Sequence, residues 1–138
     1  MIWTMKVELL FGHYAEEECI RLIEIDSSST LEELHLSIQN AISFDNDHLY
    51  EFYISRTERS REREVFDDDS GGIYDTPLEN LYPLPAGKKL FYLFDYGDHW
   101  LFRISRSRRK PIQPLNSTEY PRVVERIGEN PEQYPAYD

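Results

Sequence analysis

Apolar and polar residues alternate along residues 2–11, IWTMKVELLF, and this period of two constrains the fold more than any other feature. It predicts a strand that buries one face and exposes the other. Residues 18–25, ECIRLIEI, are rich in β-branched side chains and predict a second strand. The GHYAEE segment between them is typical of a turn, so we expect the two strands to pair as a hairpin.

The period then changes to that of a helix. Thr30 and Glu33 form a capping-box pair, in which each side chain can accept a hydrogen bond from an exposed backbone amide at the helix start. Apolar residues recur at helical spacing from Leu31 to Ile42, so this segment predicts an amphipathic helix that packs on a sheet. Three further strands are predicted by the segments that follow, at residues 48–55, 88–95 and 99–106.

The predicted order is strand, strand, helix, strand, loop, strand, strand. A helix that crosses one face of a mixed sheet after an opening hairpin is the β-grasp, or ubiquitin-like, arrangement, which is an α+β fold. We therefore expect a single β-grasp-like domain over residues 1–138. Its helix would span 30–43 and face the sheet with four apolar residues, Leu31, Leu34, Ile38 and Ile42. Outside this core we expect an exposed charged excursion at 56–76 and a proline-rich tail at 111–138, with a short helix at 120–129.

The chain carries a net charge of −11, with 26 acidic against 15 basic residues. Duplex DNA repels such a surface, because non-specific binding needs lysines and arginines that neutralise phosphates, so duplex DNA is not an expected partner. The single cysteine, Cys19, excludes an intrachain disulfide, and we expect it to be a packed, inert thiol in a strand. We see no signal peptide and no apolar run of membrane-spanning length, and we expect a cytoplasmic protein.

One segment departs from the acidic composition. Residues 103–110, RISRSRRK, contain five cations and no acid, namely Arg103, Arg106, Arg108, Arg109 and Lys110. The simplest interpretation is a solvated strand end whose arginines pair with acids elsewhere in the domain. An alternative is a contact surface for an acidic partner, a phosphate or a nucleic acid, with aromatic residues such as Tyr92 and Phe102 nearby.

The stretch FDYGDHW joins two apolar runs and combines features of a turn with those of a site. As a turn, Gly97 would supply a positive φ, and Asp95 and Asp98 would accept hydrogen bonds from loop amides. Trp100 would begin the return strand, which leaves only His99 without a structural role. We expect this stretch to be a turn in the first place.

The competing interpretation unites this turn with His48, at the start of the predicted third strand. The candidate binding residues are then His48, Asp95, Gly97, Asp98, His99 and Trp100, and an enzyme would use the two histidines and two aspartates among them. The four histidines of the chain show no metal-ligating spacing, and His35 is expected to be partly buried, so we predict no metal and no cofactor. The chain has no Gly-x-Ser-x-Gly motif, phosphate loop or dinucleotide fingerprint, so we assign no catalytic residue.

These observations favour a small non-enzymatic domain that binds a protein partner or acts as an adaptor. Aromatic residues make up 14% of the chain, more than one helix-on-sheet core obviously requires, and interfaces are enriched in tyrosine, tryptophan and arginine. A nucleic-acid accessory protein that uses residues 103–110, and an enzyme built around the FDYGDHW turn, are the alternatives. The sequence leaves the identity of the partner and the oligomeric state open.

Three stretches together resemble a known family. They are a threonine-capped helix with Leu-His before Asp-x-x-His-Leu-x-x-Phe in 30–54, a signature similar to Tyr-Asp-Phe-Gly-Asp-x-Trp in 90–104, and a Pro-Arg pair before a glycine and a Pro-Glu step in 120–135. In these segments the chain resembles the plasmid pRi ORF-3-like family, some members of which are named as passengers of insertion sequences. The resemblance implies a β-grasp-like fold and an association with mobile elements, and it implies no particular chemistry. The chain departs from the pattern at Phe102, where relatives usually have histidine, and in its shorter tail.

Overall fold

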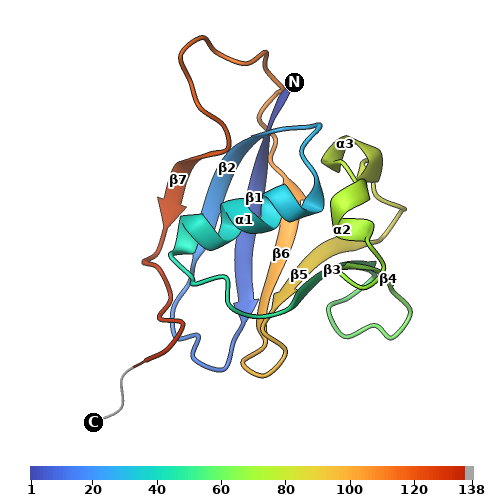
Figure 1. Cartoon of the computed structure of the whole chain (residues 1–138), viewed down its shortest axis with the longest axis vertical. Helices are drawn as coiled ribbons and strands as arrows, with labels where there is room; N and C mark the ends of the chain where they lie inside the picture. Colours follow the sequence, from blue (N-terminus) through green and yellow to red (C-terminus); the bar gives the residue numbers. More distant parts are fainter. Residues whose placement is uncertain (136–138) are drawn as a thin grey trace.

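A computed structural model describes residues 1–135 and arranges the chain around one sheet of seven strands (Figure 1). In chain order the elements are β1 (Ile2–Phe11), β2 (Ile20–Asp26), α1 (Leu31–Ile42), β3 (Tyr50–Ser55), β4 (Glu64–Asp67), α2 (Gly72–Asp75), α3 (Leu78–Leu81), β5 (Lys89–Phe94), β6 (Trp100–Arg106) and β7 (Arg122–Ile127). The strands lie in the order β4-β3-β5-β6-β1-β2-β7, and every neighbouring pair is antiparallel. No described helix is long and apolar enough to cross a membrane.

The predicted β-grasp arrangement is wrong. A mixed sheet contains at least one parallel pair, whereas β6 is antiparallel to β1, with Ile104 opposite Val7. The hairpin of β5 and β6 inserts as a unit between β3 and β1, so that β5 pairs with β3 and no parallel pair forms. The result is a sheet-rich antiparallel fold. Local periodicity identifies strands, but it does not determine which strands become neighbours.

Two edge strands lie where the sequence predicted other structure. Strand β4 falls inside the predicted excursion at 56–76, and β7 replaces the helix predicted at 120–129. In β7, Val123 lies opposite Ile23 of β2 and packs against the main core, while Arg126 donates a hydrogen bond to a carbonyl at the end of α1. The open edge of β2 would otherwise leave backbone groups unpaired, and this outweighs the weak helical spacing of the segment.

The helix prediction is confirmed. The backbone amide of Glu33 donates to Thr30 Oγ1 at 3.3 Å, which caps the first turn of α1. The helix lies across one face of the sheet (Figure 1), and its predicted apolar stripe is fully buried there, at Leu31, Leu34, Ile38 and Ile42. This face holds the main hydrophobic core.

A second, smaller apolar cluster lies on the opposite face of the sheet, at Tyr53, Phe91, Leu93 and Leu101. The segment after β3 folds back onto it. The Tyr53 hydroxyl donates to the Glu58 carbonyl at 2.8 Å, and the Arg63 guanidinium lies 4.0 Å from the centre of the Tyr53 ring. Part of the predicted excursion therefore covers a face of the sheet instead of extending into solvent.

A buried polar network crosses the main core from α1 to β5. His35 Nδ1 lies 2.5 Å from the Tyr92 hydroxyl, and His35 Nε2 lies 2.6 Å from Oδ1 of Asn46. Gln39 Nε2 donates to the same tyrosine hydroxyl at 3.0 Å, and the Asn46 amide donates to Gln39 Oε1. These partners assign a neutral His35 that donates through Nε2 and accepts through Nδ1, because an amide oxygen accepts and the tyrosine has one proton to give.

The environment of His35 disfavours its charged form. The ring is only 2% exposed and stacks on Tyr50, with the ring centres 3.5 Å apart. Burial lowers the pKa of His35 from 6.5 to about 4, against the opposing effect of the hydrogen bond to Asn46.

We expect the stability of this protein to fall on mild acidification because of His35. Unfolded His35 takes up a proton near its ordinary pKa of 6.5, whereas folded His35 does so only at about 4. The stability that neutral His35 contributes is therefore present above pH 6.5 and is lost progressively as the pH falls towards 4, by up to about 3 kcal/mol. Urea melts at a series of pH values measure this loss.

The matched control for this pH dependence is His35→Gln, which cannot titrate. Its free energy of unfolding should change less with pH in the same window, whatever its value at neutral pH. Parallel pH dependence in the two proteins would show that other groups cause the loss.

Candidate functional site

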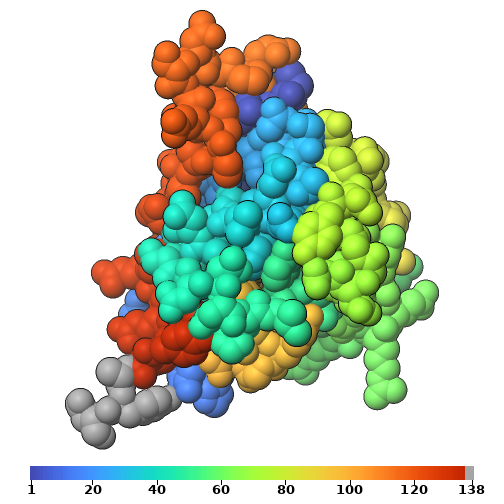
Figure 2. All heavy atoms as spheres, viewed as in Figure 1, coloured from blue at the N-terminus to red at the C-terminus, as the bar shows by residue number. Residues whose placement is uncertain are grey.

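Four segments without lysine or arginine gather at one end of the sheet, which we call the loop end. They are residues 12–19, 43–49, 95–99 and 128–135. They follow β1, α1, β5 and β7, and all four lie at the lower end of the views in Figures 1 and 2. Function concentrates on loops that a rigid scaffold positions, so this end is the first candidate site.

Asp95 organises the FDYGDHW turn at the centre of the loop end. Its Oδ1 accepts from the amides of Gly97 and Asp98 at 3.1 and 3.2 Å, and its carbonyl accepts from the His99 amide at 2.6 Å. Asp95 is 5% exposed, so most of its charge is shielded from water. The prediction that an aspartate here satisfies loop amides holds for Asp95, and the structure records no such bond to the Asp98 carboxylate.

The predicted positive φ of Gly97 is wrong. The left-handed positions are Asp95, with φ of 64°, and His99, with φ of 56°, at the two ends of the turn. Aspartate and histidine enter this region more readily than most residues, and the side-chain bonds of Asp95 stabilise it locally. Glycine is therefore not required at the turn itself.

Glycine is required instead at position 12, in the neighbouring loop at 12–19. A Cβ on Gly12 would lie 2.5 Å from a ring carbon of Trp100, which is completely buried at the start of β6. Trp100 also packs edge-on against Phe44, with the ring centres 5.0 Å apart. Trp100, a predicted site residue, is therefore part of the core and holds the loop at 12–19 against the sheet.

The turn contacts the neighbouring loops on both sides. His48 Nε2 lies 3.3 Å from Asp95 Oδ2, and the Asp95 amide donates to the Leu49 carbonyl at 3.0 Å. On the other side the His13 amide donates to the Asp98 carbonyl at 2.8 Å. The structure therefore brings together His48 and Asp95 among the predicted site residues.

His99 has a different neighbour. Its ring packs edge-on against Phe11, with the ring centres 5.5 Å apart. Phe11 is itself 55% exposed, so the two rings form part of an open surface. Of the proposed set of two histidines and two aspartates, the recorded side-chain contact joins His48 and Asp95.

Two residues of the tail, which the sequence did not single out, complete this arrangement. The Tyr134 hydroxyl donates to Asp47 Oδ2 at 2.7 Å and lies 2.6 Å from His48 Nε2, so its oxygen accepts from the histidine. Gln133 binds Asp47 Oδ1 through Nε2 and the Asp45 amide through Oε1, each at 2.8 Å. These bonds hold residues 133–134 of the tail against the loop after α1, and we call them the clasp.

The hydrogen bond between Tyr134 and Asp47 shifts the pKa of both side chains. The hydrogen bond to the Asp47 carboxylate raises the pKa of Tyr134 to about 12. The same bond lowers the pKa of Asp47 below its ordinary value. At neutral pH the pair is thus a neutral phenol donating to a charged carboxylate, which is a strong hydrogen bond.

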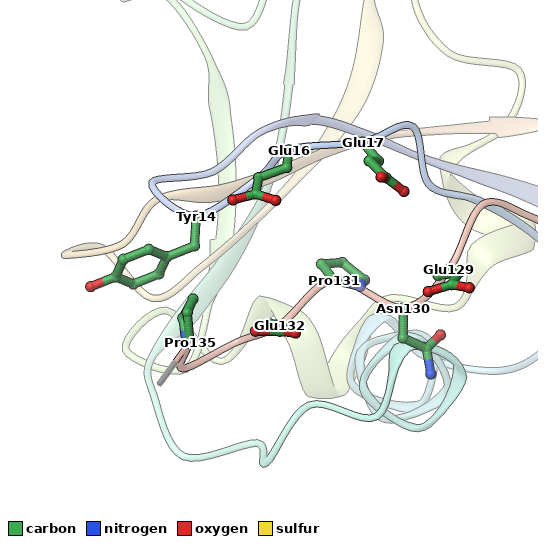
Figure 3. Close-up of a pocket in the computed structure, with 8 residues that line it drawn as sticks. All are labelled: Tyr14, Glu16, Glu17, Glu129, Asn130, Pro131, Glu132 and Pro135. Carbon is green, nitrogen blue, oxygen red and sulfur yellow. The ribbon is translucent and has the colours of Figure 1, made fainter. Parts of the chain in front are cut away.

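A cavity of about 200 Å³ opens between the loop at 12–19 and the tail (Figure 3). Its wall contains four glutamates, Glu16, Glu17, Glu129 and Glu132. Tyr14 and two prolines add apolar surface, and Asn130 completes the lining. Together the four segments of the loop end carry nine acidic residues, Glu16, Glu17, Glu18, Asp45, Asp47, Asp95, Asp98, Glu129 and Glu132.

Exposed apolar side chains accompany these acids. Leu49, Tyr96 and Tyr134 are 66%, 47% and 51% exposed, and Leu10 and Phe11 are also exposed at the adjoining end of β1. Within residues 1–135, no group of three or more His, Cys, Asp or Glu side chains could hold a metal ion.

The basic segment at 103–110 runs towards the opposite end of the sheet. Arg103 pairs with Glu8 at 2.7 Å, Arg109 pairs with Glu125 at 3.2 Å, and the Arg106 guanidinium lies 3.8 Å from the centre of a Trp3 ring. Arg108 and Lys110 are exposed. Cys19 is buried, and burial raises the pKa of its thiol.

The sequence model of the plasmid pRiA4b ORF-3-like proteins matches residues 2–133, nearly the whole chain. This chain belongs to that family. An uncharacterised protein of Sinorhizobium fredii is 27% identical over 128 residues, which cover 93% of this chain and 64% of the relative. This ORF-3-like chain therefore spans less than two thirds of the length of that relative.

A solved structure supports the fold of this ORF-3-like protein. The crystal structure of a protein of unknown function from Methanosarcina mazei Go1 is similar, with a TM-score of 0.69 at 20% identity. The similarity covers 91% of this chain and 68% of the archaeal one.

We expect Gly12→Ala to destabilise the ORF-3-like protein and Gly97→Ala to be tolerated. The new Cβ at position 12 would overlap the buried Trp100 ring and cost about 1–3 kcal/mol of unfolding free energy. At position 97 the nearest atom would be Asp95 Oδ1 at 3.4 Å and φ is not positive, so the change should stay within about 0.5 kcal/mol. Urea denaturation of the two variants measures both values, and a larger loss for Gly97→Ala would contradict this account of the turn.

Proposed function

We propose that this ORF-3-like protein is a non-enzymatic protein-binding module and that its partner docks on the loop end. One observation carries the proposal. Exposed apolar and aromatic side chains lie there among nine acidic residues, in segments that contain no lysine or arginine. Protein interfaces are enriched in such aromatic residues, and a field of a single sign selects partners of the opposite charge.

The chemistry of the loop end specifies the kind of partner. A basic segment would meet complementary charge, and its apolar side chains could cover Phe11, Leu49 and Tyr96. The cavity beside Tyr14, with its four glutamates, has the size and charge to receive a lysine or arginine side chain. The proposed partner is therefore a protein segment that alternates basic and apolar residues.

The polar side chains of Asp95 and His48 in the loop end are already bonded to other groups of the protein, and this supports a binding role over a catalytic one. Asp95 uses one carboxylate oxygen on two loop amides and the other near His48, and His48 Nε2 donates to Tyr134. Groups that hold the loops in place in this way pre-organise a surface, and pre-organisation lowers the cost of binding.

Site-specific photocrosslinking tests the proposal. A benzophenone amino acid in place of Phe11, in the cells that make this protein, should form a discrete crosslink to a protein partner. The matched control is the same amino acid in place of Tyr74 on α2, an aromatic residue of similar exposure, 49% against 55%. Because the attraction is electrostatic, the Phe11 crosslink should weaken as salt is added.

The identity of the captured protein adds a second criterion. The crosslinked segment, located by mass spectrometry, should contain several lysines or arginines. Equal crosslinking from both positions, no crosslink from position 11, or an acidic captured segment would each contradict the proposal.

A further inference from the structure

A second cavity, of about 310 Å³, lies where β5 begins, away from the loop end. Its walls come from β1, β6 and the segment that leads into β5. The lining contains five cations and one acid, namely Lys6, Lys88, Lys89, Arg103, Arg106 and Glu8. Such a wall is unexpected in a chain with a net charge of −11.

Most of this positive charge is not compensated. Arg103 pairs with Glu8 at 2.7 Å, which neutralises one cation and the one acid of the lining. For the other four cations the part of the chain that the structure describes offers no carboxylate within 4.0 Å. Lysines and arginines that line a cavity without counter-charges are typical of an anion site.

The position of Arg106 is fixed by an aromatic contact, which suits it to bind an anion. Its guanidinium lies over the Trp3 ring at 3.8 Å, and the same ring packs edge-on against Tyr82, with the ring centres 5.8 Å apart. A stacked guanidinium keeps its N–H donors while its position is fixed, so little conformational freedom is lost on binding.

Tyr82 supplies a separate observation that points to a ligand. Tyr82 is one of the residues that line the cavity, and its hydroxyl is buried with no hydrogen-bond partner among residues 1–135. A buried hydroxyl without a partner costs free energy, and native proteins rarely leave one so. A small movement of the ring towards the cavity would bring this hydroxyl within reach of a ligand oxygen.

We propose that this cavity binds a small organic anion that carries a phosphate. The four free cations more than neutralise a doubly charged phosphate, and binding would let the Tyr82 hydroxyl donate to one of its oxygens. Leu84 and Ile104 give the same wall apolar surface that could contact an organic body. The cavity volume is at the lower end of the range for small-molecule sites, roughly 300–1,000 Å³, so the ligand is small.

Titration of the full chain with inorganic phosphate, ribose 5-phosphate and a short single-stranded oligonucleotide, followed by NMR, tests the proposal. Ribose 5-phosphate should bind more tightly than inorganic phosphate, with the largest shifts at the amides of Lys88, Lys89 and Ser105. Equal affinity of the two would contradict the proposal, because inorganic phosphate alone would then account for the binding.

Variants that remove charge distinguish a specific binding site from non-specific electrostatic attraction. Lys88→Gln with Lys89→Gln should weaken binding of ribose 5-phosphate at least about tenfold, since two direct charge contacts are lost. The control, Arg108→Gln with Lys110→Gln, removes the same charge from exposed positions outside the cavity and should weaken binding less than about twofold. Equal losses in the two double variants would overturn the proposal.

Tyr82→Phe distinguishes a role of the hydroxyl in binding from a role in stability. It should weaken binding of ribose 5-phosphate by about three- to tenfold, because one hydrogen bond is lost. It should leave the melting temperature of the unliganded protein unchanged or higher, because the hydroxyl has no partner there. No binding of either phosphate, a lower melting temperature with unchanged affinity, or oligonucleotide binding that strengthens with length and maps outside the cavity would each contradict the proposal.

Discussion

The buried hydrogen-bond network between α1 and β5 sets the geometry on which the loop end depends. Tyr92 on the sheet holds His35 and Gln39 of the helix, and both of these residues hold Asn46 in the loop after the helix. Asn46 is in the left-handed region, with φ of 52°, and its bonds to the helix stabilise that conformation. The next two residues along the chain contact the turn of Asp95 and the clasp of Tyr134. A change in this core network would therefore alter the conformation of the loop end, only a few residues along the chain.

The same sheet keeps two charged regions apart. The antiparallel hairpin of β5 and β6 has its turn in the acidic loop end and its open end in the wall of the basic cavity. A protein partner at one end and a small anion at the other would thus occupy separate surfaces of one rigid sheet. Separation of charge within a small domain orients it towards each ligand and disfavours wrong contacts.

Local features were predictable from the sequence, and long-range contacts were not. The capping pair and spacing of α1, and the hairpin of β5 and β6, follow from interactions between residues close in the chain. The strand order and the edge strand β7 depend on contacts between distant residues, which periodicity does not encode. Within the site, His48 and Asp95 were identified by residue type, whereas Tyr134 lies 86 residues from His48 and is an ordinary tail tyrosine in the sequence. Gly97 was misjudged because aspartate and histidine take the left-handed positions of the turn.

Hydrogen exchange in Tyr92→Phe tests most directly whether the core network positions the loop end. The variant leaves His35 and Gln39 without their shared partner and removes nothing at the surface. The amides of Asn46 and Asp95 should exchange at least about tenfold faster than in the parent, beyond the general acceleration in Ile54→Val, a core variant outside the network. Acceleration at these two amides no greater than in Ile54→Val would contradict the account, because the loop end would then hold its geometry without the network.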